Sequence, residues 1–66
     1  MILFDPLWTT LENKKIKQQR LIDAGINRRT LYKLKRNEAV NTETLNTICK
    51  ILDCNIQDIC IYKNIE

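Results

Sequence analysis

Histidine is missing from this 66-residue sequence, and glycine and proline occur once each. Without histidine the chain lacks the commonest general base near neutral pH, so catalysis is not expected. One glycine and one proline are too few for the many tight turns of an all-β fold, and a hydrophobic content of 44% argues against disorder. The sequence therefore predicts a single small helical domain over residues 1–66, with no enzyme activity and no cofactor.

Long apolar runs are also absent. No stretch approaches the roughly 20 apolar residues that cross a bilayer, and the opening MILFDP lacks the basic start and the longer apolar stretch of a secretory signal. A cytoplasmic protein without a membrane partner is expected. The three cysteines, Cys49, Cys54 and Cys60, lack the close pairs and the histidines of zinc sites, which predicts reduced, partly buried thiols and no metal.

Positive charge is concentrated in one segment. Residues 14–36 contain nine of the 11 basic residues and one acid, a net charge of +8, whereas the rest of the chain carries −5. The nine are Lys14, Lys15, Lys17, Arg20, Arg28, Arg29, Lys33, Lys35 and Arg36. Such a segment attracts nucleic acid, because lysine and arginine near phosphates release condensed counterions. A merely solvated basic surface is the alternative.

One helix-start pattern occurs three times, in INRRTL (26–31), VNTETL (40–45) and CNIQDI (54–59). In each segment an asparagine follows an apolar residue and precedes another apolar residue by four positions. Asparagine is a strong N-cap, and the flanking apolar pair can form a hydrophobic staple. The pattern predicts helices that begin after Asn27, Asn41 and Asn55, with the staple pairs Ile26 and Leu31, Val40 and Leu45, and Cys54 and Ile59.

Two further helices are expected upstream. Asp5 followed by Pro6 is typical of an N-cap with proline at the first helical position, which predicts a helix over 6–13. A second helix over 17–24 has a weak start, because no capping residue stands before it, and ends at Gly25.

The carboxyl-terminal half continues this pattern. The helix after Asn41 carries one apolar stripe, formed by Leu45, Ile48, Cys49 and Leu52. A short fifth helix is expected after Asn55, followed by an extended segment around residues 59–62.

The third helix, predicted over residues 28–36, separates its charged and apolar residues. At 100° per residue, one face holds Arg28, Arg29, Tyr32, Lys33 and Arg36, and the opposite face holds Thr30, Leu31 and Leu34. Because a helix and a glycine turn precede it, residues 17–36 predict a helix-turn-helix. The second helix of that motif can lie in the DNA major groove, which is about 12 Å wide.

The residues AGINRRTLYKLKRNEAVNTETLNTICKILDC, continuing through NIQDI, resemble the small Cro/CI-type (XRE-like) helix-turn-helix regulators. The resemblance covers roughly residues 6–59 and implies an all-α, compact five-helix Cro/CI repressor-like DNA-binding domain. Family members usually have an apolar residue five positions before the turn glycine, and a small residue directly follows that apolar residue. This chain has Arg20 and Leu21 at these two positions. If Leu21 is instead the apolar anchor, Ile22 replaces the small residue.

The resemblance also implies which side chains contact DNA. Phosphate contacts are expected from Gln18 or Gln19, and from Lys35 and Arg36. Base contacts are expected from Asn27, Arg28 and Arg29, and contacts to bases or adjacent phosphates from Tyr32 and Lys33. Either arginine of the pair 28 and 29 can bind guanine O6 and N7 bidentately. Lys14, Lys15 and Lys17 would flank the duplex as phosphate contacts or remain solvated.

The predicted function is sequence-specific transcriptional regulation, with repression by operator occupancy through helix 28–36 in the major groove. The expected partners are double-stranded DNA and a second copy of the chain, since one small module contacts only a few base pairs; no small-molecule ligand is evident. The apolar ends, MILF and ICIY, could form the dimer interface or close over the core. The alternative is an antitoxin-like or other protein-interaction module on the same fold.

Overall fold

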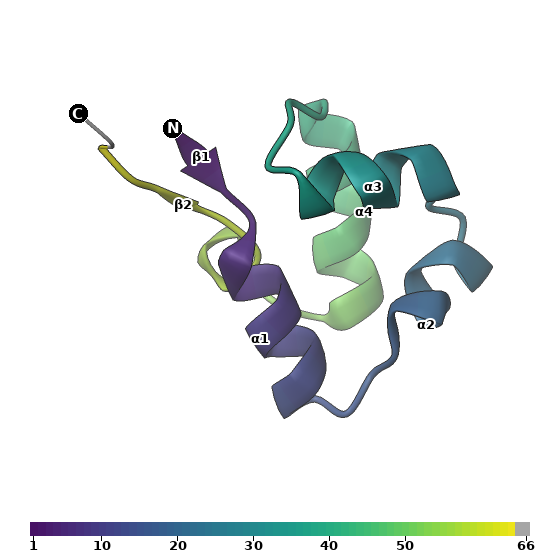
Figure 1. Ribbon diagram of the computed structural model, residues 1–66. Coiled ribbons are helices and arrows are strands. Elements are labelled where there is room, and N and C mark those ends of the chain that lie inside the picture. The colour runs from purple at the N-terminus through teal and green to yellow at the C-terminus, as the bar shows by residue number, and fades with distance from the viewer. Residues whose placement is uncertain (65–66) are drawn as a thin grey trace.

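The computed structural model describes residues 1–64. Four α-helices, a 3-10 turn and two short strands follow one another along the chain (Figure 1): β1 (Ile2–Leu3), α1 (Asp5–Asn13), α2 (Gln18–Asp23), α3 (Arg28–Lys35), α4 (Thr42–Leu52), η1 (Ile56–Asp58) and β2 (Ile61–Tyr62). The strands form a two-stranded antiparallel ribbon that brings the two ends of the chain together. In Figure 1 this ribbon and α2 lie on opposite sides of the molecule.

A single apolar core holds these elements together. Its residues come from all four α-helices, from the segments before α1 and α3, and from the position after η1. They are Phe4, Leu7, Leu11, Leu21, Ile26, Leu31, Leu34, Ile48, Leu52 and Ile59. Burial of apolar area contributes about 25 cal/mol per Å², so this cluster is the main stabilising feature of so short a chain. The described part of the chain has no helix that is both long and apolar enough to cross a membrane.

All three predicted asparagines are N-caps, and those of α3 and α4 form the expected side-chain bond. The Asn27 Oδ1 accepts a hydrogen bond from the backbone N–H of Thr30 at 2.8 Å, and the Asn41 Oδ1 accepts one from Thr44 at 2.9 Å. Each bond satisfies one of the backbone donors that the first turn of a helix leaves without an intrahelical partner. The predicted starts of α3 and α4 are therefore confirmed.

The third cap begins a shorter element than predicted. After Asn55 the chain makes one 3-10 turn, η1, in place of a fifth α-helix. Its N-cap bond runs from the Asn55 backbone N–H to the Asp58 carboxylate at 3.0 Å. Ile59, which follows this turn, is fully buried, and the chain must then extend to pair with β1. The chain therefore has four α-helices and one 3-10 turn among the described residues, where five helices were expected.

The start of α1 also differs from its prediction. The helix begins at Asp5, and Phe4, not Asp5, occupies the N-cap position without a side-chain cap. Phe4 is only 3% exposed, and its backbone N–H donates to the Asn37 Oδ1 at 2.7 Å. This anchoring of Phe4 sets the start of the helix one residue earlier. Asp5 then lies in the first turn, where its negative charge interacts favourably with the helix dipole.

The turn between α2 and α3 matches the sequence prediction. Lys17 stands at the start of α2 without a side-chain cap, and Gly25 has φ of 118°, which only glycine adopts readily. Leu21 is fully buried and Arg20 is exposed. Leu21 is therefore the apolar anchor of α2, and half-buried Ile22 takes the place of the small residue.

The third helix ends one residue earlier than the predicted 28–36. Arg36 is the C-cap, and its backbone N–H still donates to the Tyr32 carbonyl at 3.1 Å. Asn37 follows in the left-handed region with φ of 56°, a conformation that asparagine tolerates better than most residues. The left-handed Asn37 ends α3 and turns the chain toward α4.

Candidate nucleic-acid interface

The outward face of α3 is basic. Leu31 and Leu34 fix the orientation of the helix, because they are 5% and 0% exposed and lie in the core. The predicted opposite face is consequently in solvent. Its members, all exposed, are Arg28, Arg29, Tyr32, Lys33 and Arg36.

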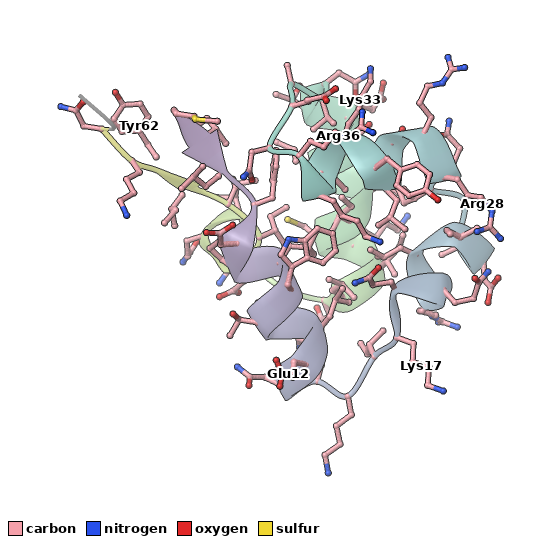
Figure 2. All side chains as sticks on the ribbon, in the orientation of Figure 1. Glu12, Lys17, Arg28, Lys33, Arg36 and Tyr62 are labelled. Atoms are coloured by element: carbon pink, nitrogen blue, oxygen red, sulfur yellow. The ribbon has the colours of Figure 1, made fainter. Side chains whose placement is uncertain are left out.

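Four of these five residues share one shallow depression. It has a volume of about 420 Å³ and is lined by Arg29, Tyr32, Lys33, Arg36 and Glu38. Figure 2 shows Arg28 at the end of α3 beside α2, and Lys33 and Arg36 toward the end that leads to α4. The cations are thus spread along the whole helix, as a surface that follows a groove of DNA requires.

Asn27 has only part of its hydrogen-bonding capacity left for a ligand. Its Oδ1 is already the acceptor in the cap bond to Thr30. The side-chain NH2 group, which only donates, remains available. Asn27 can therefore donate to acceptors on a base edge or a phosphate. The bidentate pairing of asparagine with adenine would require its Oδ1 as an acceptor as well.

Tyr32 and Lys35 form a pair on this surface. The Lys35 Nζ lies 5.6 Å from the centroid of the Tyr32 ring, within the range of a cation–π contact. The Tyr32 side chain is 54% exposed although it is large and aromatic. The Lys35 charge thus lies beside the exposed ring.

Glu38 is the residue of this surface that the sequence did not indicate. Its Oε2 lies 3.7 Å from the Arg36 Nη1, and both side chains are largely exposed. An exposed ion pair contributes about 0 to 1 kcal/mol to stability. Its main effect is therefore to offset part of the positive charge that Arg36 presents on this surface. The only sequence signal was an acid two residues after a basic helix end, which is too common to be diagnostic.

The residues around the start of α2 are only partly available. Gln18 and Gln19 are exposed, and the Gln19 Nε2 donates to the Asp23 Oδ1 at 3.0 Å, one turn further along α2. Lys17 is exposed at the N-cap position. Figure 2 shows Lys17 and Arg28 at the two ends of α2, on the side of the molecule away from the ribbon.

The structure separates Lys14 from these residues. Lys14 lines a polar cleft of about 340 Å³ together with Thr10, Asp53 and Asp58. Lys14 is also the C-cap of α1, and Lys15 follows it with φ of 56°. Positive charge at a helix C-terminus interacts favourably with the helix dipole. Both lysines thus lie at the C-terminal end of α1, and Lys14 lines a cleft that also contains acidic side chains.

The three thiols lie outside the basic surface and are half-buried, as predicted. Burial raises the pKa of the Cys54 thiol, and neighbouring Cys49 raises it further. The Cys60 pKa is raised by the same two causes. Among the described residues no group of three or more cysteines, aspartates and glutamates is arranged to hold a metal ion.

Comparison with known proteins decides the family. The model of the Cro/C1-type HTH DNA-binding domain matches residues 6–64 of the chain. The chain belongs to this family. The helix-turn-helix comprises α2, the turn at Gly25, and α3, which is its recognition helix.

A solved structure supports this assignment. The crystal structure of transcriptional regulator VanUg is similar, with a TM-score of 0.84 and 31% sequence identity over 91% of this chain and 81% of that chain. Comparison with curated proteins finds no match. The predominantly helical helix-turn-helix fold is confirmed, and it is that of a DNA-binding regulator.

Proposed function

We propose that this protein is a sequence-specific transcriptional repressor that places its recognition helix, α3, in the major groove of its operator. The observation that carries the proposal is the division of α3 into a buried leucine side and an exposed basic side. Direct base contacts come from the first turn, where Asn27, Arg28 and Arg29 lie. Bound in this way, the protein represses by keeping other proteins from the operator.

The other basic residues position the domain on the duplex. Phosphate contacts come from Lys17 and Gln18 at the start of α2, and from Lys33, Lys35 and Arg36 on α3. Tyr32 lies beside them. Phosphate contacts fix register and supply affinity but carry no sequence information. Gln19, which is bonded to Asp23, serves as an additional phosphate contact through its remaining donor.

A homodimer is the form that binds. One domain of this size contacts only a few base pairs, and two domains on half-sites about 34 Å apart gain both affinity and specificity. Residues 1–66 act as one domain in this assembly.

Salt dependence is the first test of the proposal. Binding of the protein to random duplex DNA should weaken steeply with salt, with a slope of about 0.9 in log Kd per log salt for each phosphate contact. Fluorescence anisotropy with a labelled duplex measures it. A flat response would refute DNA binding and favour a protein-interaction module on the same fold.

Three single substitutions then test the roles of individual residues. In a selection from random duplexes, Arg28→Ala should relax the preference at one or two positions, at a cost of about 1 to 3 kcal/mol on the preferred site. Lys17→Ala should weaken all sequences alike and reduce the salt slope by about one. Lys14→Ala removes the same charge outside the surface and should leave the slope unchanged. Equal losses from all three substitutions would rule out the assigned base contact.

A further inference from the structure

A second surface lies beyond the basic face, where the described chain exposes most of its large apolar side chains. All but Tyr32 of these are at the ribbon or η1: Met1, Ile2, Ile56, Ile61 and Tyr62. Ile2 and Tyr62 share one face of the ribbon, whereas Ile61 lies on the other face. Met1, Ile2, Ile56 and Tyr62 therefore form the patch. A monomeric protein rarely exposes such side chains together, and a gathered patch marks an interaction surface.

This patch borders an apolar groove of about 710 Å³. One wall is formed by Met1 and by Ile2 of β1, and the other by residues 37–40 and by α4, with Leu45 and Cys49. Figure 1 shows β1 and the α3–α4 connection facing each other across this region. Polar side chains, among them Glu38, stand in the lining. An apolar floor with a polar rim is the usual anatomy of a protein interface.

Tyr62 projects beside the groove. It is 71% exposed, the most exposed of the large apolar side chains. Tyr62 pairs with Ile2 in the ribbon, and side chains of directly paired residues lie on the same face of a sheet. Because Ile2 lines the groove, Tyr62 extends from the same side of the ribbon. A projecting aromatic side chain thus stands next to an apolar groove.

We propose that this groove receives a second copy of the chain, with Tyr62 of each copy seated in the groove of the other. A two-fold interface requires a surface that is complementary to itself, in which residue i contacts j and j contacts i. A projection beside a groove on one face meets that requirement. The location of the interface deepens the homodimer of the proposed function and rests on it for its biological purpose.

Charge favours the same occupant. The ribbon end carries a positive group, the exposed Lys63 side chain, which directly follows Tyr62. The groove lining carries the Glu38 carboxylate. When Tyr62 of one copy enters the groove of the other, these opposite charges approach each other twice, once on each side of the axis. Opposite charges of this kind fix register and orientation.

The two surfaces can be occupied together. Figure 2 shows Tyr62 on the side of the molecule away from Arg28 and Lys17. A copy seated at the ribbon therefore leaves the basic face of each recognition helix open to DNA.

Sedimentation equilibrium of the full chain without DNA tests the proposal. From about 1 µM to about 1 mM protein, which covers weak and moderate affinities, we expect a monomer–dimer equilibrium. Tyr62→Ser and Ile56→Ser should each weaken it about tenfold. Tyr32→Ser removes the other tyrosine, which is 54% exposed and lies outside the patch, and should change the dimerisation constant less than twofold. Circular dichroism checks that each variant remains folded.

A charge exchange tests the orientation. Lys63→Glu should weaken dimerisation about threefold, and combining it with Glu38→Lys should restore it. A chain that stays monomeric at every concentration, forms larger assemblies, or loses affinity equally with Tyr32→Ser would overturn the proposal, as would failure of the exchange to restore dimerisation. Salt-dependent DNA binding by a strict monomer would overturn the groove proposal and the homodimer but leave DNA binding by this domain intact, whereas a dimer that binds no DNA would overturn DNA binding and leave the groove proposal intact.

Discussion

Asn37 ends the recognition helix and also ties it to the amino-terminal segment, so its substitution tests both roles. Its Oδ1 accepts from the Phe4 backbone N–H at 2.7 Å, and Phe4 is almost fully buried. Asn37→Ala leaves that buried donor unsatisfied, which costs about 1 to 3 kcal/mol. It also places alanine in the left-handed region, at φ of 56°, which costs about 1 to 2 kcal/mol more. The expected total is about 2 to 5 kcal/mol.

That loss is large for this chain. A domain of this length is stable by about 3 to 10 kcal/mol, and each kcal/mol lowers the Tm of a small domain by about 4 to 8 °C. Asn37→Ala should therefore lower the Tm by at least about 8 °C. Urea unfolding followed by circular dichroism and by Trp8 fluorescence measures the change in the free energy of unfolding.

Two matched variants separate the contributions. Asn37→Gly loses the hydrogen bond but tolerates the positive φ, so it should be about 1 kcal/mol more stable than Asn37→Ala. Asn37→Asp keeps an acceptor and should be the most stable of the three. Equal stability of the alanine and glycine variants would refute the backbone contribution, and an aspartate variant no better than the glycine variant would refute the hydrogen bond.

Three other predictions concern the cap, the ion pair and the thiols. Asn27→Ala should cost about 0.5 to 2 kcal/mol of stability through loss of the cap, measured by urea unfolding in the absence of DNA; an unchanged midpoint would contradict the cap's role. Glu38→Gln should free Arg36 for phosphate and tighten binding to all duplexes, with a steeper salt slope; weaker binding in anisotropy would contradict this effect. Because burial raises the pKa of the Cys54 and Cys60 thiols, the folded chain holds these protons to higher pH than the unfolded chain, so stability should fall as pH rises through and above the ordinary thiol pKa of about 8.5; a constant urea midpoint from pH 8 to 10 would contradict the shift.

The sequence predicted the local structure around the recognition helix well. The caps at Asn27 and Asn41 and the turn at Gly25 depend on residues within a few positions of one another, and such short-range preferences are visible in a sequence. The outward face of α3 followed from its 3.6-residue period once Leu31 and Leu34 were assigned to the core. For these features, local chemistry and tertiary packing favour the same structure.

The features that the sequence did not predict depend on contacts across the chain. The extended segment at 61–62 was predicted, but its pairing with residues 2–3 was not, because strands of two residues are too short to show an alternating pattern. The bond from Phe4 to Asn37 moved the start of α1, and it joins residues 33 positions apart. Lys14 belongs to the basic segment of the sequence, but the packing of α1 places it beside Asp53 and Asp58. Charge density along a sequence therefore overstates the size of the basic surface.

The connection at residues 37–40 belongs to both proposed surfaces. It follows directly from the recognition helix, and it forms part of the groove wall. Within it, Glu38 pairs with Arg36 on the DNA side, and Asn37 holds Phe4 on the groove side. A second copy in the groove would therefore contact the residues at which α3 ends. Because coupling between two binding events is reciprocal, any strengthening of DNA binding by the dimer must be matched by an equal strengthening of dimerisation by DNA.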